Sequence, residues 1–321
     1  MAMLGFATQP TQTLRNGSEA SYAMQVKVAV GQWRIGAPPH FDDFAARVER
    51  ELAAVVAQGA QLALLPEYLA MELAYTFGPQ VYGDLHSSLA AVNTLYPQWR
   101  ALFGEIAQRH GIYLLAGSFL RRQDDGSYRN RSLLFDPQGR HAWQEKLRLT
   151  GFEKDAKAIT PGNALKVFDT EFGRVGVNIC YDVEFPLFAR AQSEAGAVLL
   201  LVPSCTDTPA GAARVRIGCQ ARALENQIPV LCAVTAGDSD WSAALDTNTG
   251  RAAIYVQPDR GLPDGGVLAE LDAEAGWLVA EVDIAAVKAA RSNGQVGVAT
   301  DWPGQLLPGL QRARVTSFER T

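Results

Sequence analysis

The sequence predicts one layered α/β domain, and two observations lead to this prediction. Short runs of aliphatic and β-branched residues recur along the chain, and longer amphipathic runs lie between several of them. This alternation of strand and helix favours helices that cover the faces of a sheet. The composition agrees, because 48% hydrophobic and 20% charged residues in a chain of 321 are typical of a globular protein with a large core.

Nine runs are predicted as strands. Most of them lack strict alternation of polar and apolar residues, so we expect them to be buried on both faces or against one deep face. In chain order they are VKVAVGQW (26–33), LALLPEY (62–68), IYLLAGSFL (112–120), RSLLFD (131–136), RVGVNICYD (174–182), AVLLLVPSC (197–205), PVLCAVTA (229–236), RAAIYVQ (251–257) and GWLVAEVDI (276–284).

Four runs between these strands are predicted as helices. In the first of them, Phe44, Val48, Leu52 and Val55 fall on one stripe at helical spacing, and Gly59 ends the run. The four runs are FDDFAARVERELAAVVAQG (41–59), YPQWRALFGEIAQRHG (96–111), FPLFARAQSEAG (185–196) and GAARVRIGCQARALENQ (211–227).

The chain is predicted to form a single domain from residue 24 to residue 321, with a C-terminal extension from about residue 286. Residues 1–23 are rich in Thr, Gln, Ser, Asn and Gly and show no apolar periodicity. A segment of this kind has too little apolar surface to bury, so we expect it to be a flexible tail.

Charge and composition argue against several classes of partner. The net charge of −5 gives no basic footprint for nucleic acid, and no apolar run reaches the length of a membrane span. The four cysteines contain no C-x-x-C pair, which favours a reducing compartment, and we expect the cytoplasm. The four histidines are scattered, so we expect no metal site.

Chemically useful side chains stand where the predicted strands end. Glu67 closes LALLPEY, Cys180 closes the strand that begins at residue 174, and Lys146 and Glu153 lie in the segment WQEKLRLTGFEKD. Each has a simpler interpretation when taken alone: a surface glutamate, a solvated charged loop, or an inert core thiol. Only their combination suggests a reaction.

A thiol, a lysine and two carboxylates together suit attack on a carbonyl or nitrile carbon. A nearby carboxylate such as Glu67 can take the proton of Cys180. Attack builds negative charge on the heteroatom, and a cation such as Lys146 can stabilise that charge while also favouring the thiolate. A second carboxylate, Glu153, can hold the lysine charged.

Three segments carry a family resemblance: LLPEY around Glu67, KLRLTGFE from Lys146 to Glu153, and GVNICYDVEFP around Cys180. They are accompanied by GQW (31–33), VPS (202–204) and ARALENQIPV (221–230). In this order, over roughly residues 25–285, the chain resembles the nitrilase superfamily of carbon–nitrogen hydrolases.

The resemblance implies a four-layer αββα sandwich, in which two mixed β-sheets pack face to face with helices outside. It implies Glu67 as general base and acid, Lys146 as oxyanion stabiliser, Cys180 as nucleophile and Glu153 as the fourth catalytic residue. The implied activity is hydrolysis of a small amide or N-carbamoyl substrate through a Cys thioester, which releases ammonia or an amine. The resemblance implies no metal and no organic cofactor.

Four further residues, Tyr68, Asn130, Tyr181 and Ser204, are expected to bind substrate. The resemblance implies that the Tyr181 backbone N–H lies beside the oxyanion. Asp182 and Glu184 are expected to support Cys180 from behind. Family members commonly pair through the helices that follow the nucleophile, so we expect a homodimer or a larger even-numbered assembly.

Other functions stay open on the sequence alone. Nitrile hydrolysis or acyl transfer could use the same residues, although Cys180-Tyr181-Asp182 in place of Cys-Trp-Glu favours an amidase. A non-catalytic binding subunit on this scaffold and a Cys–His hydrolase are two further alternatives. Arg148 stands where many family members carry histidine, which leaves the identity of the substrate open.

Overall fold

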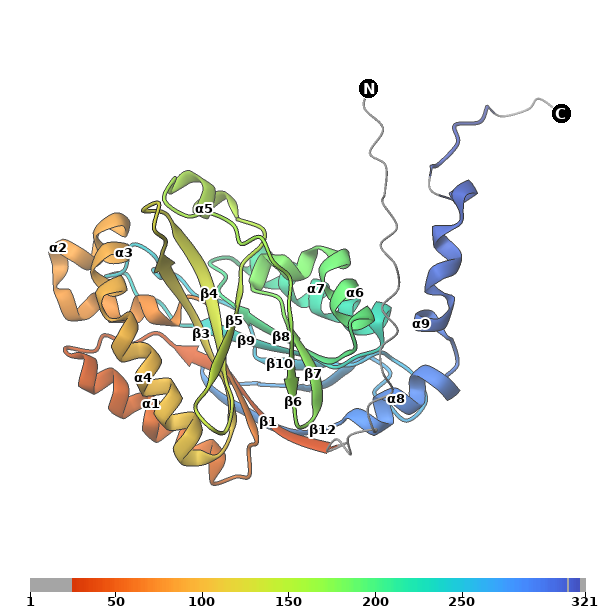
Figure 1. The fold of residues 1–321 in the computed structure, drawn as a ribbon, viewed down its shortest axis with the longest axis horizontal. Helices are drawn as coiled ribbons and strands as arrows, with labels where there is room; N and C mark the ends of the chain where they lie inside the picture. Colours follow the sequence, from red (N-terminus) through yellow and green to blue (C-terminus); the bar gives the residue numbers. More distant parts are fainter. Residues whose placement is uncertain (1–24, 311, 318–321) are drawn as a thin grey trace.

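The computed structural model describes residues 25–310 and 312–317, which form a mixed α/β fold (Figure 1). The predicted tail, residues 1–23, lies outside the described residues. The strands are β1 (Gln25–Arg34), β2 (Leu62–Leu65), β3 (Tyr113–Arg122), β4 (Tyr128–Phe135), β5 (His141–Glu145), β6 (Val167–Thr170), β7 (Gly173–Val177), β8 (Ala197–Ser204), β9 (Val230–Ala236), β10 (Ala253–Tyr255), β11 (Val267–Glu270) and β12 (Gly276–Asp283).

Helices lie between and outside the strands. The α-helices are α1 (Phe41–Val56), α2 (Pro79–Tyr82), α3 (Leu85–Thr94), α4 (Tyr96–His110), α5 (Gly151–Asp155), α6 (Pro186–Glu194), α7 (Pro209–Asn226), α8 (Ile284–Asn293) and α9 (Val298–Asp301). The 3₁₀-helices are η1 (Leu69–Phe77), η2 (Cys180–Glu184), η3 (Trp302–Leu306) and η4 (Pro308–Leu310). The predicted helices are confirmed as α1, α4, α6 and α7.

Hydrogen bonds join the strands into one nearly closed sheet, in the order β5-β4-β3-β2-β1-β9-β8-β7-β6. β1 is the junction: residues 28–30 pair with β2, and residues 32–34 pair with β9. β12 pairs with β1 along its other side, and β10 pairs with β9. The sheet is mixed, as predicted, but its strands form one hydrogen-bonded network, so the division into two separate sheets stays a prediction.

The sheet has two parts that meet where β1 pairs with β9, and we call strands β1–β5 and strands β6–β9 its two wings. Apolar side chains from both wings meet in a shared core. One cluster combines Val28 and Leu64 of the β1–β5 wing with Val177 and Leu201 of the β6–β9 wing, and all four are buried. A second cluster packs α1 and α4 against the β1–β5 wing, with Trp99 among its buried members. Figure 1 shows α6 and α7 covering the other wing.

The direction of the strands decides where the candidate residues gather. β2, β1, β9, β8 and β7 run parallel to one another, so their carboxyl ends share one edge of the sheet. β5 also ends at this edge, because it is antiparallel to β4, which is antiparallel to β3, which is parallel to β2. Open α/β sheets bind ligands at this edge.

The chain beyond β12 forms α8 and then α9, which contacts the end of α7 through a hydrogen bond from the Ala299 backbone N–H to Gln227 Oε1 at 3.0 Å. Figure 1 shows the chain extending away from the sheet after α9. The described part of the chain beyond β12 exposes several large apolar side chains, namely Val296, Leu306, Leu307, Leu310 and Val315. Among the described residues, no helix is both long and apolar enough to cross a membrane.

Candidate active site

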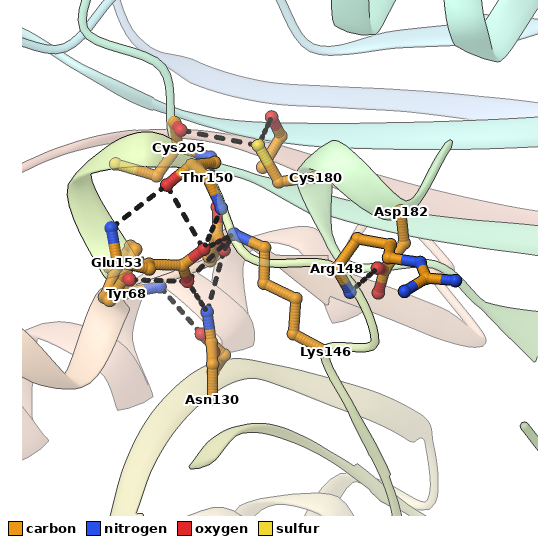
Figure 2. A network of polar contacts seen from close by, with 12 residues as sticks. Tyr68, Asn130, Lys146, Arg148, Thr150, Glu153, Cys180, Asp182 and Cys205 are labelled. Carbon is orange, nitrogen blue, oxygen red and sulfur yellow. Dashed lines mark hydrogen bonds and ion pairs between the residues drawn. The ribbon is translucent and has the colours of Figure 1, made fainter. Parts of the chain in front are cut away.

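Three connections at the carboxyl edge bring the predicted catalytic residues together, and Figure 2 shows Lys146, Glu153 and Cys180 among them. Glu67 follows β2 by two residues, and Lys146 directly follows β5. Glu153 lies on α5, and Cys180 opens η2, three residues after β7. Segments far apart in the sequence therefore place all four side chains in one buried cluster.

Two of these connections hold strained backbone. Cys180 has φ = 48° and Tyr68, next to Glu67, has φ = 59°, a left-handed conformation that residues other than glycine adopt rarely. Gly117 of β3 makes the turn at Glu67 possible, because a Cβ atom there would lie 2.2 Å from the Pro66 carbonyl oxygen. Strain of this kind persists where surrounding contacts fix the backbone, and it often marks functional sites.

Lys146 stands between two carboxylates. Its Nζ donates to Glu67 Oε1 at 2.7 Å and lies 2.9 Å from Glu153 Oε2. All three side chains are at most 1% exposed. Burial alone lowers the pKa of Lys146, but the charges of Glu67 and Glu153 outweigh burial and raise it well above its usual range. Lys146 is therefore a fixed cation.

The two carboxylates differ in their surroundings. Burial raises the pKa of Glu67, and the Lys146 charge offsets only part of this effect. Burial also raises the pKa of Glu153, but the Lys146 charge and hydrogen bonds from Lys146, Thr150 and Tyr68 outweigh it, so the net shift is downward. The structure thus separates a carboxylate that can exchange a proton from one that stays ionised, a division typical of acid–base sites.

The charge of Glu153 raises the pKa of Glu67, and hydrogen bonds to Glu153 add to the difference between the two carboxylates. Glu153 sits in a capping box with Thr150, the N-cap of α5, whose backbone N–H donates to Glu153 Oε2 at 2.9 Å. The Tyr68 hydroxyl donates to Glu153 Oε1 at 2.8 Å. Glu67 Oε1 accepts a hydrogen bond from the Asn130 side-chain amide at 2.8 Å, and Glu67 Oε2 accepts one from the Cys205 backbone N–H at 3.1 Å. Both carboxylates are therefore held in place, and Glu153 more firmly.

The thiol of Cys180 is protonated in the resting site. Burial raises its pKa well above the usual range and the charge of Glu67 raises it further, while Lys146 lowers it. Its Sγ donates to the Cys205 carbonyl at 3.5 Å and accepts from Ser204 Oγ at 3.2 Å. Lys146 does favour the thiolate, as expected from the sequence, but burial and the charge of Glu67 outweigh it, so the net shift of the Cys180 pKa is upward.

Asp182 connects η2, the 3₁₀-helix that begins with Cys180, to the residues that follow Lys146. It is 1% exposed, and its Oδ1 accepts the backbone N–H groups of Leu147 at 3.1 Å and Arg148 at 2.7 Å. Burial raises the pKa of Asp182 to about 7 against the opposing effect of these hydrogen bonds and of Lys146. The residues after Lys146 are thereby tied to the 3₁₀-helix that begins with Cys180.

A cavity of about 290 Å³ opens onto the cluster. Of the predicted residues, it is lined by Glu67, Tyr68, Lys146, Cys180, Tyr181 and Glu184. Glu153 and Asp182 lie behind the lining, and so do two residues expected to bind substrate: Asn130 is fully buried against the carboxylates, and Ser204 is buried against Cys180. In the described residues, no group of His, Cys, Asp or Glu is arranged to hold a metal ion.

Several residues of this site were missed by sequence reasoning. Cys205 lines the cavity, and its backbone contacts both Glu67 and Cys180. A backbone contribution leaves no signal in residue type. Arg214 and Asp246 also line the cavity, but each lies in a segment with no motif, and only the fold brings them to the site.

Residues 27–292 match the model of a family described as carbon-nitrogen hydrolase. The chain belongs to the carbon–nitrogen hydrolase family. It is 28% identical over 290 residues to a probable hydrolase, YhcX, of Bacillus subtilis, covering 89% of this chain but only 55% of that protein. It is 28% identical over 235 residues to omega-amidase NIT2-A of Xenopus laevis, covering 71% of this chain and 78% of that protein.

Solved structures agree with this assignment. Nit3 of Saccharomyces cerevisiae, a member of the nitrilase superfamily, matches with a TM-score of 0.65 at 22% identity, covering 84% of this chain and 94% of that one. An amidase from Nesterenkonia sp. matches with a TM-score of 0.61 at 25% identity, covering 86% of this chain and 96% of that one. The protein is thus a member of the carbon–nitrogen hydrolase family and shares the fold of these structures.

Proposed function

We propose that the protein hydrolyses small amides or N-carbamoyl compounds through a thioester on Cys180. The observation that carries this proposal is the buried cluster in which Lys146 bridges Glu67 and Glu153, next to the Cys180 thiol and at the floor of one cavity. A proton acceptor, a fixed cation and a nucleophile then face the same small space, as acyl transfer requires.

In the first half-reaction, Cys180 Sγ bonds to the amide carbon while Glu67 takes the thiol proton. The carbonyl oxygen becomes an oxyanion, which Lys146 and the Tyr181 backbone N–H stabilise. The C–N bond then breaks, Glu67 returns the proton to the leaving nitrogen, and ammonia or an amine departs. Because the resting thiol is protonated, proton transfer to Glu67 must accompany the attack.

In the second half-reaction, water bonds to the thioester carbon while Glu67 takes one of its protons. The C–S bond breaks, the proton passes to Cys180 Sγ, and the acid product leaves. Each turnover consumes one amide and one water. Glu153 stays ionised throughout and keeps Lys146 charged, so the cation is in place for both oxyanions.

The remaining predicted residues act around this centre. Asn130 holds Glu67, Ser204 hydrogen-bonds the thiol, and Asp182 keeps the segment after Lys146 against η2. Tyr68 and Tyr181 present aromatic surface to the substrate from the cavity wall. Glu184 lines the cavity instead of lying behind Cys180, so we assign it to the substrate side.

We further infer a cytoplasmic homodimer whose protomer is one domain from residue 24 onward, with the two sheet wings packed as an αββα sandwich. The shared core between the wings supports the sandwich. Exposed Leu187 on α6 and Ile217 and Leu224 on α7 support pairing through these helices. Light scattering at micromolar protein tests the assembly, and a mass near that of one chain, 34.6 kDa, contradicts it.

The experiment is a panel of small amides, N-carbamoyl amino acids and nitriles, with released ammonia measured. Protein quenched during turnover is then examined by peptide mass spectrometry. We expect an acyl adduct on the Cys180 peptide and no turnover in Cys180→Ala. Cys205→Ala removes the other thiol of the same cavity and is the matched control, with its adduct on Cys180 retained. Full hydrolysis by Cys180→Ala, or an adduct on another cysteine, contradicts the mechanism.

A further inference from the structure

The mouth of the catalytic cavity carries an unbalanced set of charges. Outside the buried cluster, its lining includes three carboxylates, Glu184, Asp207 and Asp246, and one guanidinium, Arg214. Glu184 is partly exposed, and the other three residues are exposed. Because the Cys180 thiol lines this cavity, a substrate must enter it to react. The charges at the mouth therefore influence which substrates bind.

The single cation at the mouth already has a partner. Arg214 Nε lies 3.5 Å from Glu184 Oε1, so these two charges largely cancel. Neither Asp207 nor Asp246 forms an ion pair with any described residue; the side chain of Asp246 accepts the neighbouring Thr247 N–H at 2.9 Å. A substrate entering the cavity therefore meets two uncompensated negative charges.

Hydrogen bonds between two loops fix the segments that carry these carboxylates. Asp207 follows Thr206, whose Oγ1 donates to the Thr249 carbonyl at 2.6 Å, and the Thr249 N–H donates back to the Thr206 carbonyl at 2.8 Å. The Asp246 carbonyl accepts the Ser239 N–H at 2.7 Å, which closes its loop on itself. The two aspartates thus stand on cross-linked loops at one opening.

We propose that the enzyme selects amides that carry a positively charged group, such as an ammonium, at the end remote from the reacting bond. The proposal rests on the amide hydrolysis proposed above and names its substrate class. Carboxylates at the mouth of a cleft attract cations and repel anions. Phe152, which is 46% exposed, also lines the cavity and offers an aromatic face to a cation.

The test compares three amides of matched length: 4-aminobutanamide with an ammonium end, pentanamide with a methyl end, and succinamate with a carboxylate end. We expect kcat/KM to fall in that order. Each exposed carboxylate contributes about two- to fivefold to the ratio between the first two substrates, the range measured for exposed charge pairs. The ratio should also fall as salt is raised from 20 to 500 mM, because the charges are exposed.

The double variant Asp207→Asn/Asp246→Asn should reduce the ammonium-to-methyl ratio by roughly tenfold. The control Asp124→Asn/Asp264→Asn removes two exposed carboxylates that do not line the cavity, with the same change in net charge, and should keep the wild-type ratio. A preference for succinamate, or an unchanged ratio in the first double variant, overturns the inference while amide hydrolysis stands. If none of the three amides is hydrolysed, the proposed function fails and the inference fails with it.

Discussion

Replacing Lys146 by methionine would remove the cation that compensates two buried carboxylates. Breaking a buried ion pair by removal of one partner costs about 3–5 kcal/mol of unfolding free energy. Unfolding entropy is about 2.1 cal/mol/K per residue, so 321 residues give roughly 0.7 kcal/mol/K. We therefore expect the melting temperature at pH 7 to fall by about 4–7 °C, together with loss of activity.

The same variant predicts a pH dependence of stability. Without Lys146, the pKa of Glu67 in the folded state lies still further above its unfolded value, because burial and the Glu153 charge both raise it. A group with a raised folded pKa contributes stability that is present at low pH and lost as pH rises through that pKa. The stability deficit of Lys146→Met should therefore shrink between pH 7 and pH 5.

A second substitution makes the prediction sharper. Lys146→Met/Glu67→Gln leaves one buried carboxylate, which keeps its hydrogen bonds from Tyr68 and Thr150, so it should be more stable than Lys146→Met alone. Thermal and urea unfolding measure both variants, and Lys154→Met, an exposed lysine of α5, is the control for loss of a positive charge. A single variant as stable as wild type, or a double variant less stable than the single, refutes the electrostatic account.

Three further predictions concern the backbone and hydrogen bonds around the site. Gly117→Ala should lower activity at least tenfold and destabilise the fold, since its Cβ would clash with the Pro66 carbonyl; urea unfolding and kcat measure this, and unchanged values contradict it. Asp182→Asn should lower kcat and flatten the pH dependence of activity near pH 7, where the pKa of Asp182 lies; an unaltered pH–rate profile counts against it. Ser204→Ala removes a hydrogen bond that lowers the pKa of Cys180, so the pH at which iodoacetamide modifies the thiol should move upward. An unchanged pH dependence of the modification rate would show that this hydrogen bond is unimportant.

Much of the fold follows from sequence because the strands are buried apolar runs. The nine predicted strands coincide with β1–β4, β7–β10 and β12, although their ends differ. The strand around LALLPEY ends at Leu65 and not at Tyr68, because the chain turns at Pro66 and Tyr68 is left-handed. β5, β6 and β11 were missed because they are short and lie only partly buried.

What the sequence leaves open is which strands pair. The lack of strict polar–apolar alternation in β1 indicates that both its faces are buried, but it does not show that residues 28–30 pair with β2 and residues 32–34 with β9. That shared strand joins the two wings into one network. Similarly, residue type marks Glu67, Lys146, Glu153 and Cys180. The hydrogen bonds between Thr206 and Thr249, which join the two loops at the acidic mouth, depend on the fold that brings these residues together.

The charge balance of the site also lay beyond sequence reasoning, and it changes the expected course of the reaction. A lysine near a cysteine suggests a thiolate, and the charge of Lys146 does lower the pKa of Cys180. Burial and the charge of Glu67 outweigh that effect, so the pKa of Cys180 rises. A neutral thiol reacts poorly with general electrophiles. In the mechanism we propose, the thiol becomes a nucleophile when a substrate carbonyl lies against Lys146, because the developing oxyanion then interacts with the same cation and Glu67 is freed to take the proton. The proposed mechanism therefore predicts that the reactivity of Cys180 depends on the presence of a substrate.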